Sequence, residues 1–135
     1  MKYKIILLFL ISSFLFLDFG CDGAVVIAGN VLESDLPSFI IPDSIYANYE
    51  LKNPVRDAMV NFYAIDENDS THYFLFPTLF TDSLGYFSSV SGVGMGTYKG
   101  LAVVTKNGFA PDSLYFEYES SEEPLFFIIN LKKRN

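Results

Sequence analysis

The chain has 135 residues, of which 50% are hydrophobic and 19% are charged, and its formal net charge is −7. This length suits a single domain, and the apolar content is too high for a disordered chain. The only cluster of basic residues is Lys132, Lys133 and Arg134, at the end of the sequence. We therefore expect no nucleic acid among the partners of this protein.

The first segment has the pattern of an export signal. Lys2 and Lys4 stand at the start of an apolar run that continues from Ile5 to Leu17. That run of about 13 residues fits the ~7–15 of a secretory signal and is shorter than the ~20 of a membrane-spanning helix. The sequence predicts a signal helix over residues 1–20, cleavage before Cys21, and a short tether over residues 21–23.

Cys21 is the only cysteine of the chain and follows the small residue Gly20. The sequence LDFGC, residues 17–21, resembles the lipobox of bacterial lipoproteins, in the relaxed form found in Bacteroidetes. Asp18 and Phe19 depart from the small or aliphatic residues that are usual there. The resemblance implies a diacylglycerol on Cys21 and an anchor to a membrane of the bacterial cell envelope, at the outer membrane or the periplasmic face. The alternative is an ordinary secretory signal followed by a free thiol or an intermolecular disulfide.

Residues 24–135 have the pattern of strands separated by turns, with no apolar period of helical length. Residues 24–32 are rich in β-branched side chains, and in residues 57–65 the apolar side chains alternate with polar ones. Pro77 removes a backbone donor, so its strand is expected at a sheet edge or with a bend. Seven strands are predicted, over residues 24–32, 57–65, 73–81, 86–90, 97–105, 113–119 and 125–131. This pattern favours an all-β sandwich.

The segment 33–54 is the least regular part of this region. It contains Pro37, Pro42 and Pro54 and has no clear apolar period. A connection of about twenty residues is long for a compact domain, so we expect a surface loop or an inserted hairpin.

The turn and core residues of this region stand in a characteristic order. The positions concerned are Gly29, Ala58, Gly85, Phe87 and Gly108, and the most specific stretch is the motif Thr-Asp-x-x-Gly-x-Phe at residues 81–87. In this order, over about residues 24–131, the sequence resembles carboxypeptidase regulatory-like domains. The resemblance implies a seven-stranded, Ig-like sandwich of the transthyretin-like (prealbumin-like) type, which is a noncatalytic accessory module.

The sequence departs from this family in two places besides the long segment 33–54. Arg56 and Asp57 stand where a Gly before Ala58 is typical, and Tyr98 lies about two residues too far from Gly108. A β-bulge at Gly100 is one explanation of this spacing.

Few residues of the chain suggest catalysis. His72 is the only histidine, which excludes a histidine-rich zinc site, and the lipobox already assigns Cys21 to the anchor. No Gly-x-Ser-x-Gly motif offers a nucleophile. We therefore expect no enzymatic activity and no cofactor.

Two acidic clusters offer alternatives to this expectation. Asp66, Glu67 and Asp69 carry oxygen atoms that could bind calcium, but their order is not that of an EF-hand, so a solvated turn is the expectation. Glu117 and Glu119 suggest the paired-carboxylate chemistry of a glycosidase.

The leading hypothesis for the function is a lipid-anchored envelope module that binds or scaffolds a protein or a glycan. The alternative is a small envelope hydrolase or glycan-active protein that uses these two glutamates.

Tyrosines are the last unusual feature of the composition. The chain has 9 Tyr, 14 Phe and no Trp. Tyrosine combines apolar area with a polar tip and therefore serves both protein and sugar recognition. Five tyrosines are candidates for an exposed binding face: Tyr46, Tyr49, Tyr63, Tyr73 and Tyr115.

Overall fold

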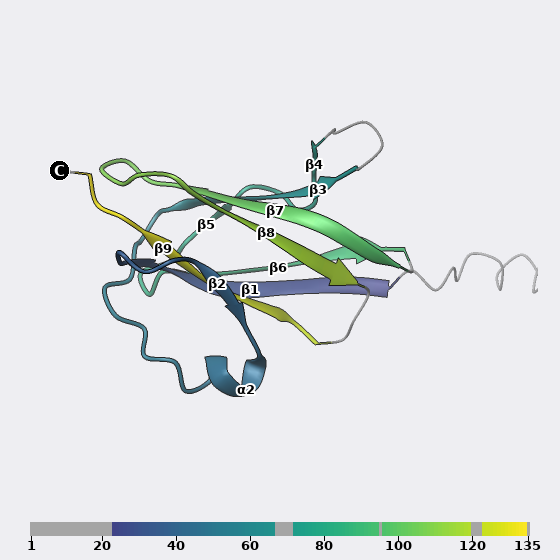
Figure 1. Ribbon diagram of the computed structural model, residues 1–135, viewed down its shortest axis with the longest axis horizontal. Helices are drawn as coiled ribbons and strands as arrows, with labels where there is room; N and C mark the ends of the chain where they lie inside the picture. Colours follow the sequence, from purple (N-terminus) through teal and green to yellow (C-terminus); the bar gives the residue numbers. More distant parts are fainter. Residues whose placement is uncertain (1–22, 67–71, 95, 120–122, 135) are drawn as a thin grey trace, which may run out of the picture.

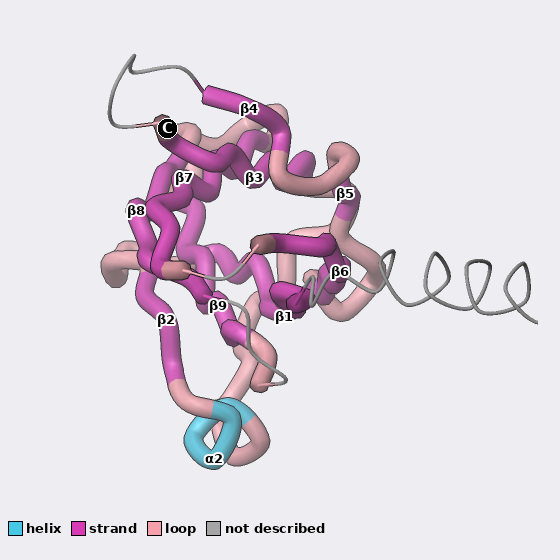
Figure 2. The backbone as a smooth tube through the Cα atoms, turned by 90° about the vertical axis from the view of Figure 1, so that its right-hand side faces the viewer, coloured by secondary structure: helices cyan, strands magenta, loops and turns pink. Residues whose placement is uncertain are grey.

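A computed structural model of the chain describes residues 23–66, 72–94, 96–119 and 123–134. These residues form two β-sheets packed face to face, with one short helix outside them (Figures 1 and 2). The expected all-β fold with two sheets is confirmed. No helix in the described residues is long and apolar enough to cross a membrane.

The first sheet, sheet A, has the strand order β2-β9-β1-β6. Its central strand β1 (Gly23–Glu33) pairs parallel with β9 (Leu125–Leu131) and antiparallel with β6 (Tyr86–Val93). The short strand β2 (Phe39–Ile41) adds to the other side of β9. Because β1 begins at Gly23, that residue lies at one end of the sandwich, whereas the chain ends at the other (Figure 1).

The second sheet, sheet B, has the strand order β4-β3-β7-β8. It consists of β4 (His72–Phe74), β3 (Met59–Ile65), β7 (Thr97–Thr105) and β8 (Asp112–Glu119). The two-residue strand β5 (Leu79–Phe80) pairs with β3 on the same side as β4. Strands β4 and β8 therefore form the two edges of this sheet.

Phe62 is the centre of the core between the sheets. Its side chain is fully buried, and its ring lies 5.7 Å from Phe76, 5.8 Å from Phe87, 5.9 Å from Phe116 and 5.2 Å from Phe127. These rings come from both sheets, so the contacts hold the two layers together. Burying one such side chain stabilises the fold by roughly 1.5–3 kcal/mol.

The described residues form nine strands where the sequence predicted seven. All seven predicted segments contain a strand, but the segment 73–81 is broken around Pro77 into β4 and β5. Between the two pieces the Leu75 amide still donates to the Phe62 carbonyl, at 2.8 Å. The expectation of an edge position and a bend at Pro77 is therefore confirmed. The remaining extra strand is β2, which lies in the segment 33–54.

The segment 33–54 is a strap that covers the outer face of sheet A (Figure 2). It contains β2 and the single helical turn α2 (Asp43–Tyr46). Because β2 pairs with β9 and not with a second strand of the same segment, the expectation of an inserted hairpin is wrong. The strap forms a second apolar cluster with the sheet, made of Leu32, Ile41, Ile128, Phe39, Tyr46, Tyr49 and Phe126.

Two buried polar side chains of sheet A, Asn30 and Asn130, fix the strap to the sheet. Asn30 on β1 is only 1% exposed, and its Oδ1 accepts a hydrogen bond from the Tyr46 hydroxyl. The Asn30 amide donates to the Leu84 carbonyl at 2.9 Å. At the other end of the strap, the Ser38 hydroxyl donates to the Asp112 carboxylate of β8. The strap therefore contacts both sheets.

The suggested bulge at Gly100 does not exist. Strand β7 keeps its register through this residue, with Gly100 opposite Ala64 on β3 and Phe116 on β8. A Cβ at this position would lie 2.3 Å from the Phe116 ring. Glycine is therefore needed here because an aromatic ring lies over the backbone, and not because the strand changes register.

Candidate functional site

Several predicted site residues lie outside the described part of the chain. These are Gly20 and Cys21 at the proposed anchor and Glu67 and Asp69 of the acidic turn. Asp66 is described and directly follows β3. No group of three or more His, Cys, Asp or Glu side chains in the described residues is arranged to hold a metal ion.

The positions that carry the family resemblance all lie in or beside the two sheets. Ala58 and Phe87 are buried in the core, and Gly29 is on the central strand β1. Gly85 and Gly108 have positive φ angles of 69° and 86°. None of the five lies in the groove or in the aromatic row described below.

An open groove with a volume of about 960 Å³ lies where β8 faces β2 and the beginning of β9. Both sheets and the strap contribute to its walls. Its floor is apolar, with Val25 from β1, Ile40 from β2, and Tyr118 from β8. Burial raises the pKa of the Tyr118 hydroxyl, and the nearby Tyr98 adds to this effect. The hydroxyl therefore stays neutral at physiological pH.

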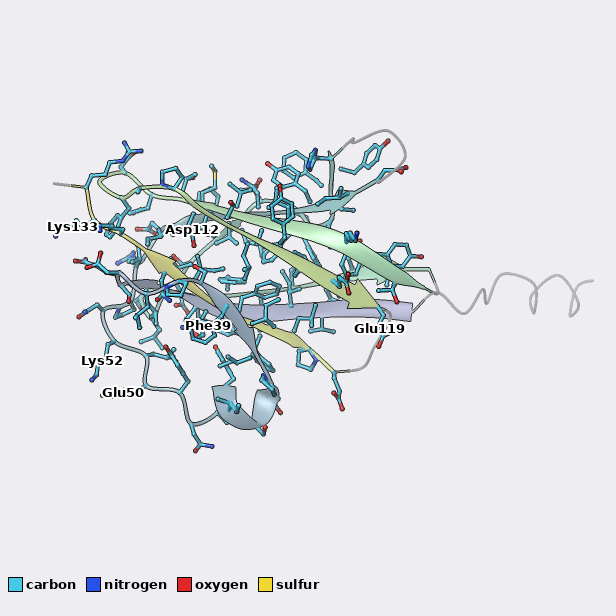
Figure 3. The ribbon with its side chains drawn as sticks, in the orientation of Figure 1. Phe39, Glu50, Lys52, Asp112, Glu119 and Lys133 are labelled. Atoms are coloured by element: carbon cyan, nitrogen blue, oxygen red, sulfur yellow. The ribbon has the colours of Figure 1, made fainter. Side chains whose placement is uncertain are left out.

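The rim of this groove is acidic. Carboxylates come from Asp43 at the start of α2, from Glu117 and Glu119 on β8, and from Glu123 just before β9. Among the described residues that line the groove there is no Lys, Arg or His. Glu119 lies at the end of β8 beside the start of β1, and Lys133 lies at the opposite end of the molecule (Figure 3). The groove therefore suits a ligand that combines apolar surface with positive charge.

The two glutamates that suggested a hydrolase do line this groove. Glu117 and Glu119 are alternate residues on one strand, so both point to the same exposed face of β8. In a glycosidase the two carboxyl groups flank the scissile bond from opposite sides. His72 does not join them, because it lies on β4, about 14 Å and three strand spacings away across sheet B.

The outer face of sheet B carries a second surface, which we call the aromatic row. It consists of Phe74, Tyr63, Leu101 and Tyr115, which stand directly opposite one another on β4, β3, β7 and β8. The rings of Tyr63 and Phe74 lie 4.9 Å apart. Phe74 is 64% exposed and Tyr115 is 71% exposed. The row therefore crosses the whole sheet as an exposed apolar band.

The five candidate tyrosines divide between the two sheets. Tyr63 and Tyr115 belong to the aromatic row, whereas Tyr46 and Tyr49 pack against the outer face of sheet A. Tyr73 is exposed on the edge strand β4. Phe74 and Leu101 were missed, because strand alternation shows which side chains share a face but not which strands are neighbours.

No protein-family model matches this chain, and no match was found among curated proteins. The functional assignment therefore depends on the leader sequence and on the geometry of these surfaces.

Proposed function

We propose that this protein is a lipid-anchored binding module of the bacterial cell envelope, without catalytic activity. Within the mature chain, which begins at Cys21, residues 24–135 form a carboxypeptidase regulatory-like domain of the seven-stranded, Ig-like and transthyretin-like type. The groove beside β8 binds a basic, extended segment of another envelope protein. A single observation carries the binding role: an apolar groove whose described lining residues include four carboxylates and no cationic side chain.

The strand arrangement supports the family proposal. When β4 and β5 are counted as one broken strand and β2 is assigned to the strap, the nine strands reduce to seven. Asp57, at the place where the family typically has Gly, has a positive φ of 55°. A backbone that favours glycine at this position agrees with the resemblance.

The position of Gly23 supports the anchoring proposal. This residue already belongs to β1 and follows Cys21 by two positions. Two residues span at most about 7 Å, so a lipid on Cys21 would hold the sandwich directly at the membrane surface. The groove opens near this end, since Val25, Thr97 and Glu119 line it.

The chemistry of the groove indicates which segments it binds. Lysine and arginine have long aliphatic stems below a charged head, so they fit an apolar floor with an acidic rim. In the described part of sheet B, β8 is an edge strand, and an extended peptide can add to such an edge as a further strand. An extended peptide with alternating basic and apolar residues satisfies both requirements.

Peptide titration of the processed full-length protein in detergent tests this proposal. The probe is a fluorescent peptide with alternating Lys and Leu, and its control has Glu in place of Lys. We expect binding of the first alone, weakened about tenfold when Glu117 and Glu119 are both replaced by Gln, and reduced by salt. Glu50→Gln, an exposed glutamate paired with Lys52 outside the groove, should have no effect.

Two results would contradict the proposal. Equal binding of both peptides would show that the acidic rim does not select the ligand. Hydrolysis of an envelope glycan that is lost in Glu119→Gln would instead support the hydrolase alternative, for which the position of Glu117 and Glu119 in a groove is the favourable observation.

A further inference from the structure

The outer faces of the two sheets are both apolar, but they differ in what covers them. On sheet A the strap covers the part of the face formed by β1 and β9, where Leu32 and Ile128 are almost completely buried, although Val90 on β6 is 63% exposed. On sheet B the described residues provide no such cover, and Phe74, Phe80 and Tyr115 are 64%, 65% and 71% exposed. Exposed apolar patches of this kind commonly mark interaction sites.

We infer that the aromatic row is the interface of a symmetric dimer, in which two copies of sheet B pack face to face. Covering the exposed two-thirds of three aromatic side chains removes roughly 350 Å² of surface from each copy. The partly exposed neighbours Met59, Tyr63, Leu101 and Val103 lie on the same face. With these neighbours the buried surface increases to about 600 Å² per copy, or about 1,200 Å² for both copies together. This total is at the lower limit for stable protein interfaces.

The direction of the two-fold axis follows from the anchor, and this part of the inference rests on the proposed function. Two copies in one membrane must both present Gly23 to the same side. A two-fold axis that runs along the strands satisfies this requirement, whereas an axis across the strands places the two anchors at opposite ends. The axis along the strands also reverses the strand order, so that β4 of one copy faces β8 of the other.

This arrangement brings complementary side chains together. The row of one copy lies over the row of the other, with Phe74 against Tyr115 and Tyr63 against Leu101. The next row toward Gly23 contains His72, Ile65, Lys99 and Glu117. In the reversed order His72 faces Glu117 and Ile65 faces Lys99, so no like charges oppose each other.

Chemical cross-linking in membranes tests the dimer and its axis together. Two differently tagged full-length chains are expressed in the same cells, one with Phe74→Cys and the other with Tyr115→Cys. A short bismaleimide is used, since facing sheets lie about 10 Å apart, too far for a disulfide. We expect a mixed, doubly tagged product and no product from either variant alone. Cells that carry only Cys21 control for reaction at the anchor.

Failure of the dimer and failure of the anchor can be distinguished in this experiment. The cross-link reports the pairing of the strands, and labelled palmitate reports the lipid on Cys21 independently. Linked products from Phe74→Cys alone would overturn the proposed axis, and the absence of any product would overturn the dimer.

As a second measurement, Tyr115→Lys should weaken self-association at least tenfold in sedimentation of the processed protein. Leu84→Lys, at a residue that is 66% exposed in the turn before β6, should leave it unchanged.

Discussion

Gly85 determines the geometry of the turn that leads into β6. Its φ is 69°, and its carbonyl accepts a hydrogen bond from the Val31 amide at 2.8 Å. The Asp82 carboxylate accepts from the amides of Leu84 and Tyr86, at 2.8 and 2.9 Å. This turn therefore depends both on a left-handed backbone and on a side chain that satisfies the free amides.

Replacement of Gly85 by Ala should destabilise the protein strongly. The new Cβ would lie 2.4 Å from the Val31 carbonyl oxygen, and the left-handed backbone disfavours Ala as well. We expect a loss of about 3 kcal/mol in the free energy of unfolding, measured by urea denaturation. Gly92→Ala is the control, because a Cβ there meets nothing within 4 Å. Equal effects of the two variants would contradict this account of the turn.

The helical turn of the strap is held to sheet A by the side chain of Tyr46, through a buried hydrogen bond and aromatic packing. Tyr46 stacks on Phe126 with ring centres 4.3 Å apart, and its hydroxyl donates to the buried Asn30 side chain. The Tyr46→Phe variant keeps the ring but leaves Asn30 Oδ1 without this donor. We expect a cost of about 1–3 kcal/mol, because an unsatisfied buried acceptor loses its solvation. Thermal unfolding should show no comparable change for Tyr49→Phe, whose ring packs on Phe39.

The same elements predict how stability depends on pH. Burial raises the pKa of the Tyr46 hydroxyl above its usual value of 10.0, and Tyr86 and Asp82 add to this effect. Burial also raises the pKa of the Tyr118 hydroxyl. The unfolded chain therefore loses these protons first as the pH increases. The two buried hydroxyl groups contribute fully to the free energy of unfolding below about pH 10. This contribution is lost as the pH rises toward their higher pKa in the folded state.

Denaturation at about pH 9 and about pH 11 measures this dependence. The wild-type protein should lose stability between these values, and Tyr118→Phe should lose less, because it has no hydroxyl to ionise. A steeper loss in the variant would show that burial of this hydroxyl does not govern the alkaline transition.

Local sequence patterns were sufficient to find every strand except β2, but they did not show which strands are neighbours. The alternation in residues 57–65 identified β3 because one face of that strand lies against the core. The strap was predicted only as a loop or hairpin. Its structure depends on contacts with Ile128 and Asn130, which are far from it in the sequence, and a local apolar period cannot reveal such contacts.

Only part of the candidate site could be predicted from the sequence. Glu117 and Glu119 stood out in the sequence, but their neighbours Ile40 and Asp43 come from the strap, so the groove itself was not predictable. The aromatic row depends on the pairing of four strands that span residues 63 to 115. Pairing over such distances is set by the packing of the whole molecule rather than by any one segment.

In the whole molecule, the proposed functions follow from one arrangement. The sandwich begins two residues after Cys21, so the anchor would hold the groove near the membrane and present the aromatic row to a second copy beside it. Anchoring by a diacylglycerol is close to permanent, because each buried methylene contributes about 0.8 kcal/mol. The distance of the groove from the membrane and the direction of the two-fold axis both depend on the lipid at Cys21.

Whether Cys21 carries a lipid is best tested by the intact mass of the protein purified from bacterial membranes. We expect a chain that begins at Cys21, lacks residues 1–20, and carries the added mass of a diacylglycerol on that residue. Globomycin should prevent the cleavage, and Cys21→Ser should abolish both the lipid and the membrane attachment. A mature chain that begins elsewhere, with an unmodified Cys21 thiol and full solubility in water, would contradict the account.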